Sequence, residues 1–218
     1  MKRLLLAGML LFPLLTMAQT ACDTAAIFAN DSTTAVCFAT SGPVRYVWAN
    51  TIPDHTDNYN QPQFDVTAID EEFAMCAYPE MAAVNTPLYE TVETTVGCTF
   101  LYAFGIAVNG IQFDPSSGDY FEDSSGANNI NWHVEATSIW NNIGQNMGTD
   151  NGGHLNPFGE YHYHGAPADY FGNTLGNDST KHSSIVGYAA DGFPIYYRYV
   201  YQDPNDTTSN IIAVNSGY

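Results

Sequence analysis

The chain contains the run Glu160-Tyr161-His162-Tyr163-His164-Gly165, in which two histidines alternate with two tyrosines. Because side chains alternate between the faces of a β-strand, a strand would put His162 and His164 on one face and both tyrosines on the other. The two histidines would lie roughly 6–7 Å apart at the backbone, and both imidazoles could reach one metal ion at about 2.0–2.1 Å. On a helix the same spacing would separate them by roughly 200°. Since tyrosine favours strands, the run predicts a short β-strand that carries a metal site.

Four of the six histidines lie between residues 154 and 182, which enlarges this candidate site. The predicted metal ligands are His162 and His164 from the strand, joined by His154 or His182 from a loop. Three acidic residues nearby in the sequence are candidates to hold the far ring nitrogens, namely Asp150, Glu160 and Asp191. Imidazole-rich sites suit Zn²⁺, Cu²⁺ or Fe²⁺. The simpler alternative is a half-buried strand whose histidines bond to backbone or carboxylate groups.

Other residues that could join the site also have simpler explanations. His55 lies in a polar loop, where a solvated role explains it equally well. His133 is next to Trp132 at the start of a predicted helix, where packing is the commoner role. Asp191-Gly192 is most simply a hairpin turn. We therefore keep these residues as secondary candidates.

The first 18 residues predict a signal peptide. The positive start Lys2-Arg3 is followed by an apolar stretch from Leu4 to Leu15 and by small residues up to Ala18. Cleavage after Ala18 is the preferred prediction, and cleavage after Ala21 is the alternative. A lipid anchor at Cys22 is a weaker alternative, because the residues before it fit the lipoprotein pattern poorly. No later stretch has the ~20 apolar residues of a membrane span, so we expect a secreted or periplasmic protein.

The chain has four cysteines, Cys22, Cys37, Cys76 and Cys98, all beyond the predicted signal. An even count in an exported chain favours two disulfides, and the sequence alone allows three pairings. We prefer Cys22–Cys37 with Cys76–Cys98, because both loops are local. The predicted organisation is a signal at residues 1–18, a disulfide-linked segment at 19–43 and a β-domain at 44–218.

The charge balance is strongly acidic, with 23 Asp and Glu against 5 Lys and Arg. Loss of Lys2 and Arg3 with the signal would leave three basic residues and a net charge of −20. Such a surface repels phosphate backbones and anionic lipids, which argues against nucleic-acid and membrane-surface roles. Most of the charge is explained by solubility. Ca²⁺ binding by Asp114, Asp119, Glu122 and Asp123 is a further hypothesis, although these residues do not form an EF-hand loop.

Turn residues and β-favouring runs predict a mainly β protein, either an antiparallel β-sandwich or a β-rich single domain with one short helix. The predicted strands are Ala35–Ala39, Val44–Trp48, two within Thr94–Asn109, Ile111–Phe113, Ser184–Ala190, Phe193–Tyr201 and Ile211–Val214. Asn109-Gly110 predicts a tight turn. The apolar spacing of Ile130–Ile143 predicts the helix, and Asp150–Gly159 is predicted to be a loop.

Longer motifs resemble one known family. The segments Gly159–Pro167 and Ile185–Tyr196, with His182 between them, resemble the YHYH-domain family of mostly exported microbial proteins. Ala49–His55 and Gly105–Pro115 resemble two further segments of that family. The resemblance runs from about Val44 to Tyr201 and implies little about activity, because the family is largely uncharacterised. Members tend to continue beyond the equivalent of Tyr218, so we expect a chain truncated at its C-terminus.

Three functions remain. The first is an exported protein that binds a transition-metal ion without chemistry of its own. The second is a metal-dependent hydrolase or oxidoreductase, in which the ion activates water or a carbonyl. The third is a carbohydrate- or surface-binding module, with Tyr161, Tyr163, Trp48 or Tyr196 as a stacking platform. Nucleophile elbows, phosphate-binding loops and zinc-protease motifs do not occur in the sequence.

Overall fold

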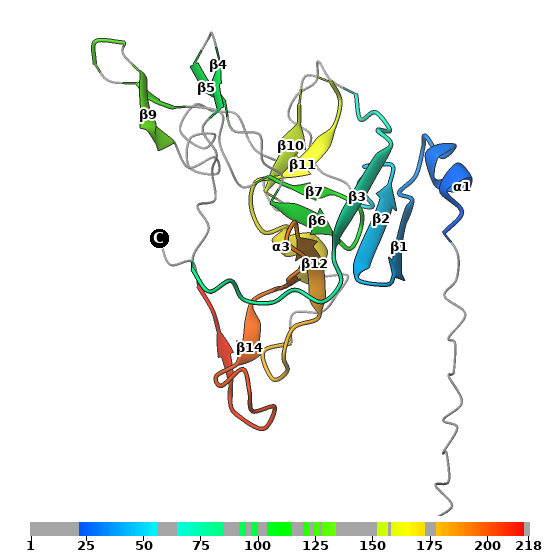
Figure 1. The fold of residues 1–218 in the computed structure, drawn as a ribbon, viewed down its shortest axis with the longest axis vertical. Helices are drawn as coiled ribbons and strands as arrows, with labels where there is room; N and C mark the ends of the chain where they lie inside the picture. Colours follow the sequence, from blue (N-terminus) through cyan, green and yellow to red (C-terminus); the bar gives the residue numbers. More distant parts are fainter. Residues whose placement is uncertain are drawn as a thin grey trace, which may run out of the picture.

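The structure is a computed structural model, and it describes residues 22–55, 65–84, 92–94, 97–99, 104–114, 120–122, 124–126, 128–133, 152–156, 158–172 and 178–215. The predicted signal peptide and Asp150 lie outside these residues. The described chain consists mainly of β-strands with short helical segments (Figure 1). This confirms the prediction of a β-rich protein.

The N-terminal part forms a three-stranded antiparallel sheet. A short helix, α1 (Thr24–Phe28), precedes the strands β1 (Val36–Ser41), β2 (Val44–Ala49) and β3 (Glu71–Cys76), which pair in the order β1-β2-β3. The β1–β2 pair is the hairpin that the sequence predicts, with Ser41 opposite Val44 at the turn.

A six-stranded sheet forms the centre of the molecule, in the order β10-β11-β7-β6-β12-β13. Its strands are β6 (Gly105–Ala107), β7 (Gln112–Phe113), β10 (Gly153–Leu155), β11 (Tyr161–Tyr163), β12 (Ile185–Ala189) and β13 (Pro194–Tyr196). Asn109-Gly110 makes the predicted turn between β6 and β7, and Gly110 has a φ of 83°. Strand β11 runs parallel to β7, whereas the other pairs are antiparallel.

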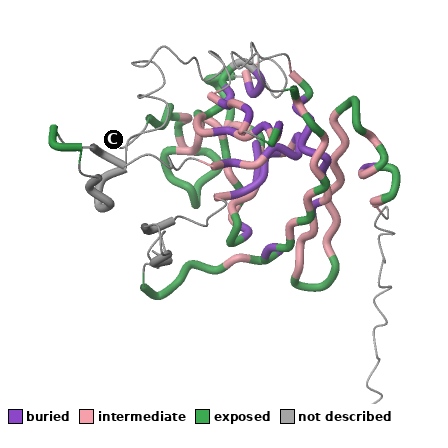
Figure 2. The backbone as a smooth tube through the Cα atoms, turned by 90° about the horizontal axis from the view of Figure 1, so that it is seen from above, coloured by how far each residue is buried: buried purple, intermediate pink, exposed green. Residues whose placement is uncertain are grey.

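Apolar side chains pack against both faces of the central sheet. On one face, Ile106 packs with Val47 of β2 and Met75 of β3, which joins the two sheets. On the other face, Ala107 and the two tyrosines of β11 pack in a larger cluster with residues of the segment at α3 (Ala168–Tyr170). Burial is concentrated in this central region of the molecule (Figure 2). Each fully buried large apolar side chain contributes roughly 1.5–3 kcal/mol to stability.

Three two-stranded sheets complete the described part of the chain. They are formed by β4 (Val92–Thr94) with β5 (Gly97–Thr99), β8 (Tyr120–Glu122) with β9 (Asn128–His133), and β14 (Tyr199–Tyr201) with β15 (Ile211–Ala213). The predicted strand Phe193–Tyr201 is therefore divided between two sheets, as β13 and β14. The β14–β15 pair lies at the bottom of the view in Figure 1.

The helix predicted at Ile130–Ile143 is wrong at its start. The segment from Ile130 to His133 belongs to β9, which pairs with β8; the remainder lies outside the described residues. The apolar spacing in this region favours a helix when only local sequence is considered. Pairing with a neighbouring strand overrides this local helical preference.

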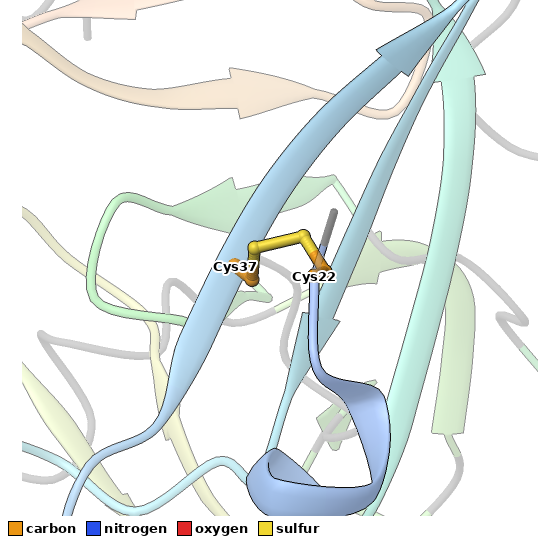
Figure 3. Close-up of a disulfide and its surroundings, with 2 residues drawn as sticks. All are labelled: Cys22 and Cys37. Carbon is orange, nitrogen blue, oxygen red and sulfur yellow. A yellow bond between two sulfur atoms is a disulfide. The ribbon is translucent and has the colours of Figure 1, made fainter. Parts of the chain in front are cut away.

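The predicted Cys22–Cys37 disulfide is formed, and it ties the segment before α1 to β1 (Figure 3). The preferred second pair is not formed, because Cys76 is a free and exposed cysteine at the end of β3. The side chain of Cys98 lies outside the described residues. Within the described part of the chain, no helix has the length and apolar content needed to cross a bilayer.

Candidate metal site

Strand β11 separates its histidines from its tyrosines, as the alternation in the sequence predicts. Tyr161 and Tyr163 are both 0% exposed and belong to the main core cluster. His162 lies between them and is partly exposed, and His164 follows at the end of the strand. The buried tyrosines determine which face of the strand points into the core, because a shift by one residue would move both phenol rings out of the core.

His154 comes from a strand, which corrects the prediction that residues 150–159 form a loop. In β10, His154 is the direct register partner of His162 in β11. The connection is organised by Asn156, whose side-chain oxygen accepts hydrogen bonds from the backbone N–H of Phe158 (2.9 Å) and of Glu160 (3.1 Å). This short connection fixes the register, and the register sets His154 opposite His162.

Two glycines allow β10 to approach β11 closely. A Cβ atom on Gly153 would lie 2.6 Å from the carbonyl oxygen of His162 and 2.6 Å from the hydroxyl of Tyr161. Gly152 has a φ of 60°, and its carbonyl accepts hydrogen bonds from the backbone N–H of His164 (2.7 Å) and of Gly165 (2.9 Å). In the sequence, the signal for this close approach is the glycine pair directly before His154.

The three histidines direct their Nε2 atoms toward one another. The Nε2 atom of His164 lies 2.9 Å from that of His162 and 3.0 Å from that of His154. The centroids of the three rings are 4.6–5.0 Å apart. One nitrogen from each ring lies within 4.8 Å of one nitrogen of each of the other two rings. Among the described residues, no fourth His, Cys, Asp or Glu joins this group.

The environment keeps two of these imidazoles neutral. Burial, followed by the neighbouring His164 and His154, lowers the pKa of His162 to about 3, although a hydrogen bond to the backbone carbonyl of Glu160 opposes this shift. Burial also lowers the pKa of His154. A neutral imidazole has a free lone pair, which is the form that binds a metal ion.

The acidic residues proposed to support the histidines differ in their hydrogen-bond partners. Glu160 supports His162 through its backbone carbonyl, while its carboxylate accepts a hydrogen bond from the Asn156 amide at 2.8 Å. Asp191 accepts a hydrogen bond from the backbone N–H of Phe193 in the β12–β13 turn, so it has the turn role that was the simpler alternative. Asp150 lies outside the described residues.

Among the histidines whose side chains the structure describes, His182 is not part of the cluster. His182 packs its ring against Tyr196 and Tyr201, and its Nδ1 lies 2.9 Å from the carbonyl oxygen of Ser183. His133 belongs to β9, and its side chain is not described. The sequence predicted His154 or His182 as the third ligand, and the structure brings only His154 to the strand pair.

A second group of polar residues lies on the tyrosine face of β11, and sequence reasoning did not predict it. The Tyr163 hydroxyl lies 2.7 Å from Nε2 of His55 and accepts a hydrogen bond from the Asn109 amide at 2.9 Å. Asn109 also donates to Asp54 at 2.9 Å. Burial and the charge of Asp54, to which its hydroxyl is hydrogen-bonded, raise the pKa of Tyr170. His55 thus helps to satisfy a buried phenol and lies on the opposite face from the three-histidine cluster.

The fold and this cluster define a β-rich protein with a three-histidine group at the edge of its central sheet. Residues 83–218 match the family model described as YHYH protein. The chain therefore belongs to the YHYH family, and Tyr161 to His164 form the tetrapeptide that carries the family's name. Comparisons with curated proteins and with solved structures gave no match.

Proposed function

We propose that this protein binds one transition-metal ion through Nε2 of His154, His162 and His164. The observation that carries the proposal is the pair of Nε2–Nε2 distances, 2.9 and 3.0 Å, that meet at His164. Two nitrogens bound to one ion at about 2.0–2.1 Å, with an angle near 90–110°, are separated by roughly 2.9–3.4 Å. The three rings therefore need only small adjustments to share an ion.

The donor set favours a borderline metal over a hard one. Imidazole nitrogen suits Zn²⁺, Cu²⁺ or Fe²⁺, whereas Ca²⁺ prefers six to eight oxygen ligands. Ca²⁺ binding by the acidic residues considered for it stays a prediction, because Asp119 and Asp123 lie outside the described residues and the side chain of Glu122 is not described. The metal that we propose is therefore a transition metal, held by neutral ligands in an acidic protein.

Passive binding is the function that we place first, in a protein exported by its predicted signal peptide. The Cys22–Cys37 disulfide supports an oxidising compartment. A metal-dependent enzyme is the second candidate, because three protein ligands leave an ion with an open position for water or substrate. All three histidines are partly exposed, which supports access to such a position.

Metal titration of the chelator-treated, full-length mature protein tests the proposal. We expect one equivalent of Zn²⁺, Cu²⁺ or Fe²⁺ to bind, and we expect His162→Ala, His164→Ala and His154→Ala each to weaken that binding at least a hundredfold. His182→Ala is the matched control, because this histidine lies outside the cluster, and it should leave the affinity unchanged. Equal affinity in the wild type and in all three cluster variants would exclude the site.

The two candidate functions differ in the ligand that completes the metal's coordination. X-ray absorption of the Zn²⁺-loaded protein should give three nitrogen scatterers and one exchangeable oxygen if the ion has an open position. Four protein ligands would favour passive binding and remove the enzyme hypothesis.

A further inference from the structure

A polar groove lies between β14–β15 and the segment that precedes β12, away from the three-histidine cluster. Its volume is about 400 Å³, which is within the usual size range for small-molecule sites. The lining residues that carry hydroxyl or nitrogen groups are Thr180, Lys181, His182, Tyr201, Thr207 and Ser209. Ile211 adds one apolar surface.

The walls of the groove are held together by backbone and side-chain hydrogen bonds. Ser183 clamps the segment before β12 to β14, because its N–H donates to the Tyr199 carbonyl at 2.7 Å and its hydroxyl accepts from the Tyr199 N–H at 2.8 Å. On the other side, Ser209 accepts a hydrogen bond from the Asp203 N–H at 3.1 Å and closes the loop between β14 and β15. A groove built on such linked segments is largely formed before a ligand binds.

Charge in the groove is nearly balanced, although the whole chain is strongly acidic. Among the described residues, no carboxylate lines the groove. The one lysine, Lys181, forms an ion pair with Asp178 at 3.0 Å, and Asp178 also accepts hydrogen bonds from Thr180. The exposed Lys181–Asp178 pair is weak, but the carboxylate beside the lysine and the single basic residue in the described lining favour a neutral polar ligand over an anion.

The Tyr201 ring and the His182 nitrogens complete the lining, and the Tyr196 ring lies beside His182. The rings of Tyr196 and Tyr201 lie 4.7 and 4.8 Å from the His182 ring, and Tyr196 is 40% exposed. Nδ1 of His182 is beside the Ser183 carbonyl, and its other ring nitrogen, Nε2, has no hydrogen-bond partner in the described part of the chain. Hydroxyls that both donate and accept, set beside aromatic faces, match a ligand that has hydroxyl groups on an apolar ring.

We propose that this groove binds a neutral carbohydrate, with a sugar ring against Tyr201 and its hydroxyls bonded to Lys181, His182 and the threonine and serine hydroxyls. This gives the chain a second binding site, independent of the metal site. It also corrects the stacking platform expected from the sequence, because Tyr161 and Tyr163 are fully buried and cannot contact a glycan. Trp48 stacks on Tyr46 in the three-stranded sheet and lines no part of the groove.

Affinity electrophoresis and pull-down of the full mature chain test this proposal. The neutral probes are cellulose, xylan, mannan, mixed-linkage glucan, starch and chitin, and the acidic probes are alginate and inorganic phosphate. We expect retention on at least one neutral polymer. Lys181→Ala, which removes a mostly exposed side chain, or Tyr201→Ala should reduce this retention at least tenfold.

Tyr78→Ala is the control, because Tyr78 is 72% exposed and lies outside the groove, and it should leave retention unchanged. The proposal is overturned by lack of retention on every neutral polymer or by binding to the acidic probes alone. Retention that neither groove variant reduces would also overturn it, since the sugar would then bind elsewhere.

Discussion

His154 and His162 face each other directly across the antiparallel strands β10 and β11. His164, two residues beyond His162, brings its Nε2 within 3.0 Å of Nε2 of His154. The cluster therefore depends on the close approach of two strands, in addition to the alternation within one of them. Residues that control this approach should control metal affinity without being ligands.

Gly153→Ala tests this dependence. The added Cβ would meet the His162 carbonyl oxygen and the Tyr161 hydroxyl at 2.6 Å, which is too close for carbon, so β10 would move away from β11. We expect metal affinity to fall at least tenfold, although all three histidines remain. Stability should fall by roughly 1–3 kcal/mol from overpacking. Isothermal titration and urea unfolding measure the two effects.

Gly42→Ala is the matched control for this variant. Gly42, unlike Gly153, has a positive φ, 57°, and its added Cβ would have nothing within 4 Å. Only backbone strain, on the order of 1 kcal/mol, would result. The metal affinity of Gly42→Ala should equal that of the wild type. If Gly153→Ala also kept wild-type affinity, the strand-approach argument would be wrong.

The sequence predicted the parts of the site that depend on local alternation. The tyrosine and histidine faces of β11 follow from the period of a strand, which the run from Tyr161 to His164 displays by itself. The choice of His154 over His182 depends on how β10 pairs with β11, and this register is set by the short connection that Asn156 organises. Such a connection is visible in the sequence only as one polar residue before Pro157.

The polar network on the other face could not be predicted from the sequence, for a similar reason. His55 and Tyr163 are 108 residues apart, and their contact requires the loop after β2 to lie on the central sheet. Without knowledge of that tertiary contact, the sequence around His55 is equally consistent with a solvated loop residue. Long-range contacts of this kind have no local pattern.

Tyr163→Phe tests the contribution of this network. The variant keeps the buried ring and removes the hydroxyl that bonds to His55 and Asn109, of which Asn109 is only 4% exposed. Loss of these bonds should lower the unfolding free energy by roughly 1–3 kcal/mol. Tyr196→Phe, at an exposed tyrosine, should change it by less than about 0.5 kcal/mol. Equal stability of the two variants in urea would contradict a structural role for the network.

The Cys22–Cys37 disulfide should stabilise the protein by restricting its unfolded state. The two cysteines are separated by 15 residues, and a loop of about that length contributes roughly 3 kcal/mol in the chain-entropy model. We expect Cys22→Ala with Cys37→Ala to lower the urea midpoint. Cys76→Ala is the control and should leave it unchanged, since Cys76 is free and exposed. Wild-type Cys76 should react with maleimide in the native state, and a protected Cys76 would contradict the free thiol.

The metal-free protein should lose stability in acid through His162. Its native pKa, about 3, lies below the unfolded value of about 6.5. Below pH 6.5 the unfolded chain therefore binds a proton that the native state excludes. The contribution to stability is fully present above pH 6.5 and is lost as the pH falls toward 3, by at most about 1.4 kcal/mol per pH unit. The lowered pKa of His154 acts in the same direction.

The difference between two proteins isolates this effect from the protonation of carboxylates elsewhere. Urea unfolding of the chelator-treated wild type and of His162→Asn should be measured between pH 7 and pH 4. The variant should lose less stability over this interval, because it lacks the proton uptake of one unfolded histidine. His182→Asn should follow the wild-type curve more closely, since this histidine is outside the cluster. If His162→Asn and the wild type lost stability in parallel, the imidazole of His162 would not be held neutral by its surroundings.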